Sequence, residues 1–125
     1  MRSITYLTLD DALHLVRLLV VGPVRDLGLL DSAIARPGSS FEGHDAYSAV
    51  EVKAAAMLDS LTKNHPLVDG NKRLGWLATA VFLDLNGYEP NLCDDGAFQL
   101  VWDVASRRVE LDEIGRRLDL HSVRR

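Results

Sequence analysis

The feature of this sequence that most constrains its fold is a helix-length segment with almost no polar face. From Asn71 to Leu85 apolar side chains occupy nearly every direction around a helical axis, and Asn86-Gly87 supplies a stop signal. A helix that is apolar all round is stable when other helices surround it. We therefore expect a mostly α-helical bundle around a central buried helix that begins at Asn71.

Amphipathic helices that could surround this segment are predicted on both sides of it. Their apolar periodicity places them from Leu9 to Val20, from Leu29 to Ala35, from a capping box at residues 48–51 to about Asn64, from Asp95 to Ser106, and from Leu111 to Leu118. The first is expected to be capped by Thr8 and to end at Gly22-Pro23. The apolar face of the fourth is predicted to contain Phe98, Val101, Trp102 and Ala105.

Two segments lack a helical period. Residues 4–7 are read as a short strand or an extended arm, and the stretch from Pro37 to Tyr47 as a mobile loop or a short β-hairpin. In neither case do the residues alone decide between the two. Because the chain has no internal repeat and no linker, we expect residues 1–125 to form a single domain.

Charge and composition exclude some classes of partner. The chain has 14 Lys and Arg against 18 Asp and Glu, a net charge of −4, so it lacks the broad basic field typical of nucleic-acid binding. It has no apolar stretch long enough to span a bilayer, and its N-terminus does not resemble a signal peptide. It has a single cysteine, Cys93. We expect a soluble cytoplasmic protein that binds neither membrane nor nucleic acid directly.

Ionisable and polar side chains are concentrated in the segment from Asn64 to Arg73, directly before and within the first turn of the apolar helix. Backbone amides at a helix N-terminus are unpaired and carry a partial positive charge, so they favour a phosphate. Lys72 and Arg73 would add full charges, and Gly70 would let the backbone approach a ligand closely. This part of the segment predicts phosphate binding.

Two further side chains in the segment supply what phosphate chemistry needs. The carboxylate of Asp69 can hold Mg²⁺ together with phosphate oxygens. His65 carries an imidazole, a group whose unperturbed pKa of about 6.5 lets it accept a proton near neutral pH. Simpler roles remain open for each residue taken singly: Asp69 as a helix cap and His65 as a partner of a loop carbonyl. The combination favours a phosphate-handling site with its own general base.

The run His65-Pro66-Leu67-Val68-Asp69-Gly70-Asn71-Lys72-Arg73 resembles the signature of the Fic/Doc superfamily. Leu67 replaces the usual phenylalanine, and an aliphatic side chain can pack in the same way. Lys72 replaces the second glycine of the Fic signature, a substitution that marks the Doc (death on curing) branch. The segments Arg25–Pro37 and Leu83–Tyr88 also resemble Doc proteins. The expected fold is thus a Fic-like helical bundle.

The resemblance implies an enzyme that uses ATP and Mg²⁺. Fic proteins transfer AMP to a protein hydroxyl, whereas Doc proteins are kinases that phosphorylate a threonine of elongation factor Tu and so stop translation. It implies that His65 is the catalytic base and Asp69 the metal ligand. The nucleotide phosphates would be held by Gly70, Asn71, Lys72 and Arg73.

The resemblance also implies partners. A Doc toxin is paired with a Phd-type antitoxin, whose C-terminal tail covers a groove near the active site. The toxin also has a β-hairpin flap that lies beside the site and receives the target segment, and Pro37–Tyr47 is the corresponding stretch here. We expect such a toxin kinase acting on a translation factor. Two alternatives stay open: a Fic-type AMP transferase, favoured less because of Lys72, and a Fic-fold protein that binds nucleotide or peptide without turnover.

Overall fold

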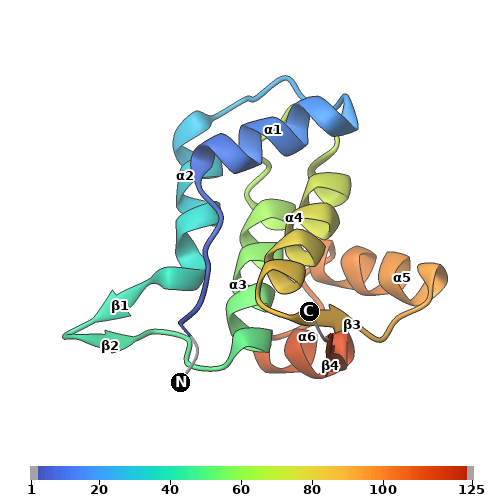
Figure 1. Ribbon diagram of the computed structural model, residues 1–125. Helices are drawn as coiled ribbons and strands as arrows, with labels where there is room; N and C mark the ends of the chain where they lie inside the picture. The colour runs from blue at the N-terminus through green and yellow to red at the C-terminus, as the bar shows by residue number, and fades with distance from the viewer. Residues whose placement is uncertain (1–2, 124–125) are drawn as a thin grey trace.

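Helices make up most of the structure, a computed structural model that describes residues 3–123 (Figure 1). The elements in chain order are α1 (Leu9–Leu19), α2 (Leu27–Ala35), the 3₁₀ helix η1 (Arg36–Gly38), β1 (Ser40–Phe41), β2 (His44–Asp45), α3 (Val50–Lys63), α4 (Asn71–Leu85), β3 (Tyr88–Pro90), α5 (Asp94–Ala105), α6 (Leu111–Leu118) and β4 (Leu120–Ser122). The mostly α-helical class is confirmed.

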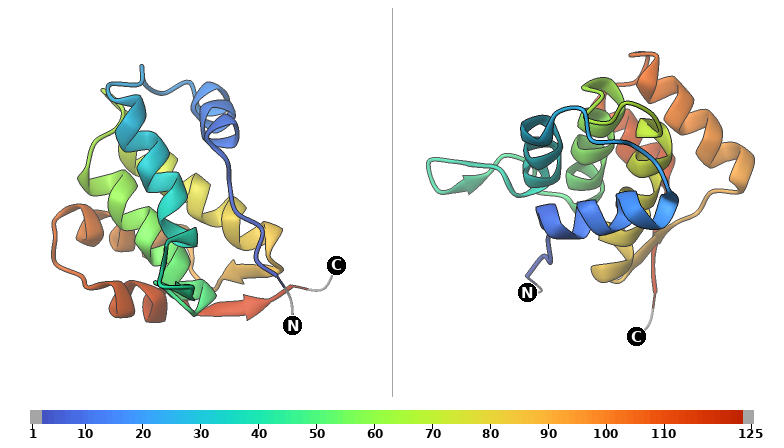
Figure 2. Two further views of the ribbon diagram at one scale, coloured as in Figure 1. Left: turned by 90° about the vertical axis from the view of Figure 1, so that its left-hand side faces the viewer. Right: turned by 90° about the horizontal axis from the view of Figure 1, so that it is seen from above.

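The helix at the centre of the bundle is α3. It packs against α2, η1, α4, α5 and α6, and Figures 1 and 2 show it between α2 and α4. Three consecutive alanines, Ala54 to Ala56, are fully buried and let neighbours approach closely on several sides. A central helix is therefore confirmed, but it is α3 and not the helix that begins at Asn71. The latter, α4, keeps Lys72, Arg73 and Leu85 at the surface.

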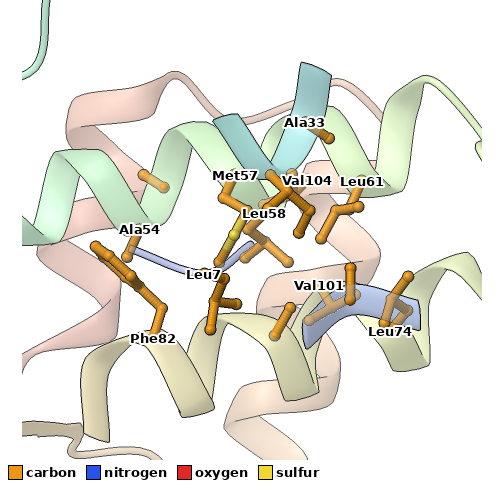
Figure 3. Packing of buried hydrophobic residues seen from close by; sticks show 14 of the residues in the cluster. Leu7, Ala33, Ala54, Met57, Leu58, Leu61, Leu74, Phe82, Val101 and Val104 are labelled. Atoms are coloured by element: carbon orange, nitrogen blue, oxygen red, sulfur yellow. The ribbon is translucent and has the colours of Figure 1, made fainter. Parts of the chain in front are cut away.

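The hydrophobic core surrounds α3 and takes residues from the N-terminal arm and from α1, α2, α4, α5 and α6, and Figure 3 shows the part where α3 meets α4 and α5. Its labelled members from these helices are Ala54, Met57, Leu58, Leu61, Leu74, Phe82, Val101 and Val104. Leu58, Leu61 and Phe82 have no exposed surface, and a fully buried side chain of this size contributes about 1.5–3 kcal/mol. This packing fixes where α3 ends and α4 begins, which is the segment that carries the candidate site.

The N-terminal arm and α1 follow the sequence prediction closely. The arm is extended, and Thr5 exchanges two hydrogen bonds with the side chain of Asn86, at 2.8 and 2.9 Å. Thr8 caps α1 in a capping box with Asp11. Val20, which the periodicity placed on the apolar face, instead adopts the left-handed conformation that ends the helix and is 88% exposed.

Two helix starts differ from prediction. α2 begins at Leu27, two residues early, because the Asp26 side chain accepts a hydrogen bond from the amide of Leu29 and caps the helix. The capping box at residues 48–51 does not form: α3 is preceded by Ala49, with no side-chain cap. Because α3 starts at Val50, Ser48 lies one residue before the cap position.

The stretch after η1 forms the β-hairpin that the sequence left open. β1 and β2 pair antiparallel, with Ser40 opposite Asp45 and Phe41 opposite His44. The ammonium of Lys53, which is 1% exposed, lies 3.3 Å from the carbonyl of Pro37 and 3.2 Å from the Asp45 carboxylate. Burial lowers the pKa of Lys53, but Tyr6 and Asp45 outweigh this, so its net pKa is raised. The hairpin is thus tied to the first turn of α3.

Arg36 fastens the base of the hairpin to the middle of α3. Its Nε donates to the Tyr47 hydroxyl at 2.9 Å, and its Nη1 donates to the Asp59 carboxylate, the Ser60 hydroxyl and the carbonyl of Ala56. Burial lowers the pKa of Arg36, but the bonds to Tyr47 and Asp59 outweigh this and raise it. The guanidinium therefore stays charged.

Replacing Arg36 by alanine is expected to lower the free energy of unfolding by about 2–3 kcal/mol, because several charge-assisted bonds are lost together. Urea denaturation followed by circular dichroism measures this. Arg17→Ala, at an exposed position on α1, is the control and should stay within about 0.5 kcal/mol of the parent. Equal stabilities of the two variants would contradict the anchoring role.

α5 is rotated relative to the prediction. Its buried residues are Ala97, Leu100, Val101 and Val104, whereas Phe98 and Trp102 are 67% and 51% exposed. The two rings stack on each other outside the core, with centroids 6.1 Å apart. The apolar spacing had placed both on the buried face of this helix. Their exposure leaves an aromatic pair on the surface of the molecule.

The C-terminal elements close the fold. β3 and β4 pair antiparallel over Tyr88–Pro90 and Leu120–Ser122. Cys93 is exposed and caps α5, its Sγ accepting from the amide of Gly96. Within residues 3–123, none of the helices has the length and apolar character needed to cross a bilayer.

Candidate active site

The signature segment forms the connection between the end of α3 and the start of α4. Asn64 ends α3, because Pro66 cannot continue the helix. Pro66 and Leu67 are buried, and Leu67 belongs to the hydrophobic core, so the aliphatic residue does the packing expected of the phenylalanine it replaces. With these two residues held inside, the polar residues on either side face outward.

A second segment, residues 22–26, pairs with this connection along its length. Val24 and Leu67 form an antiparallel bridge. The amides of Arg25 and Asp26 donate to the carbonyl of Pro66 at 2.7 and 3.0 Å. The remaining bonds run from the Val68 amide to the Pro23 carbonyl and from the Gly22 amide to the Asp69 carbonyl, each at 2.9 Å. The loop is therefore fixed by main-chain bonds from the segment that precedes α2.

Asn71 closes the loop from within. Its side-chain oxygen accepts from the Leu67 amide, and its side-chain nitrogen donates to the Leu67 carbonyl, both at 2.9 Å. Both polar atoms of the carboxamide are thus committed to the backbone. This geometry favours a role for Asn71 in shaping the loop that would surround a phosphate.

Gly70 is the residue from which α4 starts. It has φ 91° and ψ 15°, a left-handed conformation that favours glycine. It also lies against Val21: a Cβ built on Gly70 would be 2.4 Å from Cγ1 of Val21. Asp69, considered from sequence as a helix cap, does not cap α4. The first amides of the helix are therefore left free of side-chain caps, as an anion site requires.

An open cavity of about 340 Å³ lies over this helix start. It is lined by Thr62, His65, Val68, Asp69, Gly70, Asn71, Lys72 and Arg73. All the residues predicted for the site therefore surround one cavity. The hydroxyl of Thr62, which sequence analysis did not single out, donates back to the carbonyl of Leu58 at 2.9 Å.

His65 lies at the surface and lines the cavity. Its φ is 51°, a left-handed value that is uncommon for a residue with a side chain. The guanidinium of Arg25 holds the backbone here: Nε donates to the His65 carbonyl at 2.7 Å and Nη2 to the Asn64 carbonyl at 3.0 Å. An accessible imidazole beside free helix amides can take a proton from a hydroxyl that approaches a bound phosphate.

Asp69 and Arg73, which both line the cavity, form an ion pair. Their atoms are 3.7 Å apart, and the side chains are 84% and 58% exposed, so the pair is weak and can open for a ligand. Within residues 3–123, no group of three His, Cys, Asp or Glu side chains is arranged to hold a metal. A lone accessible carboxylate fits Mg²⁺ that takes its remaining ligands from phosphate and water.

Lys72 lies between this cavity and a second, apolar one. Its ammonium sits over the ring of Trp102, 5.4 Å from the centroid. The second cavity, about 440 Å³, is formed by α1, α4 and α5 and is lined by Leu19, Lys72, Arg73, Trp76, Leu77, Asp94, Ala97, Phe98 and Val101. The exposed face of α5 is thus adjacent to the candidate site.

The hairpin is not beside the site. It adjoins the first turn of α3, whereas the signature follows the last turn, about 20 Å away along a helix of 14 residues (Figure 1). Among the described residues, those from Pro37 to Tyr47 contribute nothing to the lining of the cavity at His65. The hairpin itself is confirmed, but its expected position next to the site is wrong in this structure.

The structure also identifies residues that sequence analysis did not treat as part of the site. Arg25 was noted only as part of a Doc-like segment, and its link to His65 spans 40 positions in the chain. Trp102 was assigned to the core. No local pattern signals either role, because both depend on which segments the fold brings together.

A mostly helical bundle with this helix–loop–helix site at the end of its central helix is a Fic-like fold. Comparison with known proteins agrees: a family model described as the Fic/DOC family matches residues 6–83. A protein named Toxin Doc, from Mycolicibacterium smegmatis (strain ATCC 700084 / mc(2)155), is 48% identical over 97 residues, which are 76% of this chain and 75% of that protein. The chain belongs to the Fic/DOC family.

Proposed function

We propose that this protein is the toxin of a toxin–antitoxin pair and acts in the cytoplasm as a Doc-type protein kinase. It would transfer the γ-phosphoryl group of ATP to a Thr or Ser hydroxyl of a translation factor such as elongation factor Tu. Family membership and the similarity to Toxin Doc support the toxin role. The observation that carries the enzymatic role is that His65, Asp69 and the uncapped start of α4 share one open cavity.

In the proposed reaction the phosphates of ATP bind at the start of α4. The free amides there, with Lys72 and Arg73, supply hydrogen bonds and positive charge, and Gly70 lets the backbone come close. Asn71 keeps the loop in shape through its two bonds to Leu67. Asp69 would hold Mg²⁺, which neutralises charge on the phosphate oxygens when bound.

His65 would act on the protein substrate. Its imidazole accepts the proton of the incoming hydroxyl as the oxygen forms a bond to phosphorus and the bond to the leaving phosphate oxygen breaks. The surface position of His65 suits a substrate that is itself a folded protein. The alignment of the substrate hydroxyl with the γ-phosphorus of ATP for in-line attack then depends on how the loop positions His65.

The apolar groove formed by α1, α4 and α5 supports the proposed pairing with a Phd-type antitoxin. The groove is adjacent to the site, shares Lys72 and Arg73 with it, and is lined in part by Phe98, whose exposed ring stacks on the exposed ring of Trp102. Exposed aromatic side chains of this kind are enriched at protein interfaces. A tail bound there would lie against the side chains that are proposed to hold phosphate.

The test of the enzymatic proposal is incubation of the protein with α-labelled and γ-labelled ATP, in parallel, in a translation extract. We expect only the γ label on protein, in a band absent when His65→Ala is used. The α label on protein would indicate AMP transfer instead. Absence of both labels, from protein that still binds ATP, would favour a nucleotide-binding module without turnover.

Lys72 provides a test of which group is transferred. We expect Lys72→Gly to shift the product from phosphorylated to adenylylated target, because Lys72 lines the cavity at the start of α4 and glycine would leave more room there for a nucleotide in the other orientation. Intact-mass analysis of the purified target separates the two products. The double variant with His65→Ala must give neither, and an unchanged phosphoryl product from Lys72→Gly would contradict the role given to Lys72.

A further inference from the structure

We propose that Arg25 is a positioning residue for His65: its guanidinium selects the backbone conformation that presents the imidazole to the cavity. The inference rests on the proposed function, because it assigns a role within the same site. Three contacts carry it. Arg25 donates from Nε to the His65 carbonyl at 2.7 Å, from Nη2 to the Asn64 carbonyl at 3.0 Å, and from its backbone amide to the Pro66 carbonyl at 2.7 Å.

The conformation of His65 needs such support. A left-handed φ, here 51°, costs about 1–2 kcal/mol for a residue with a Cβ. A residue that precedes proline is also disfavoured in the right-handed helical region, so its unstrained alternative is extended, with negative φ. A change of this size at φ would carry the imidazole away from its present direction. The Arg25 guanidinium favours the left-handed form because it binds both the carbonyl before the His65 N–Cα bond, that of Asn64, and the carbonyl after it, that of His65.

Arg25 is itself held firmly. Val24, before it, bridges to Leu67, and Asp26, after it, caps α2. The guanidinium therefore extends from a fixed backbone to a neighbouring segment 40 positions away in the chain. A charged donor bound to a carbonyl contributes more than a neutral one.

The rest of the loop does not depend on the Arg25 side chain. Leu67 is held by Asn71 and by the core, and Val68 and Asp69 by main-chain bonds to Pro23 and Gly22. Loss of the guanidinium should therefore release His65 while the proposed phosphate site at the start of α4 stays in place. This predicts an effect on turnover with little effect on nucleotide binding.

The experiment compares Arg25→Ala, Arg25→Lys and the control Arg17→Ala in the γ-labelled ATP assay, together with His65→Ala. For Arg25→Ala we expect kcat to fall about 10- to 100-fold, as for a displaced catalytic group. The KM for ATP should stay within about twofold, since the ground-state contacts of the nucleotide remain. Arg25→Lys, which can still donate to one carbonyl, should recover part of kcat, and Arg17→Ala should match the parent.

A second readout does not depend on activity. In a ¹H–¹³C spectrum of the histidine rings, Arg25→Ala should shift or broaden the signals of His65 and leave those of His14 and His121 unchanged. Changes at all the histidines, unfolding of both Arg25 variants, or a rise in KM with unchanged kcat would overturn the positioning role. If Arg25→Ala matches Arg17→Ala while His65→Ala is inactive, this inference alone fails. If His65→Ala retains full activity, the proposed function fails.

Discussion

Replacing His65 by alanine is expected to abolish phosphoryl transfer and the growth arrest that follows expression of the protein. Loss of a general base lowers the rate by about 10²- to 10⁴-fold, and the imidazole of His65 is the accessible base on the cavity at the start of α4. The fold should survive, because the side chain lies at the surface. Growth after induction and label transfer from γ-labelled ATP measure the two effects.

The matched control for this variant is His14→Ala, which removes an exposed histidine from α1, away from the cavity. Circular dichroism of both variants checks that each is folded. Growth arrest by His65→Ala as strong as that of the parent would refute the catalytic role. Arrest without label transfer would instead point to toxicity through binding.

Replacing Gly70 by alanine is expected to disrupt both the stability and the activity of the protein. A Cβ at this position would lie 2.4 Å from Cγ1 and 2.5 Å from Cβ of Val21, which is closer than carbon atoms can pack. Val21 is branched at Cβ and cannot move aside by a simple rotation. Overpacking and the left-handed φ together predict a loss of about 2–4 kcal/mol in the free energy of unfolding.

Activity should be lost as well, since relief of the collision would move the backbone at the start of α4. Gly43→Ala is the matched control, because Gly43 has a similar φ of 80° but nothing within 4 Å of an added Cβ. That variant should lose about 1 kcal/mol, with no change in label transfer. Urea denaturation and the transfer assay compare the two. Equal effects would show that φ alone, and not the contact with Val21, matters at Gly70.

The local part of the site could be predicted from sequence because its residues are adjacent in the chain. The proline ends α3, and the glycine and the apolar run after it start α4, so the residues from His65 to Arg73 necessarily surround one helix N-terminus. The capping of α1 followed from local chemistry in the same way, whereas the packing of Leu67 was expected from the resemblance to the Fic/Doc signature.

Tertiary packing decided the rest. Periodicity marks which residues are apolar but not which helix is surrounded, so the apolar run of α4 was taken for the centre that the small residues of α3 in fact occupy. Periodicity placed Phe98 and Trp102 on the apolar face of α5, yet the rotation of α5 turns them outward. The hold of Arg25 on His65 joins residues 40 positions apart. Sequence alone determines features fixed by neighbours along the chain, whereas contacts between distant segments exist only once the helices have packed together.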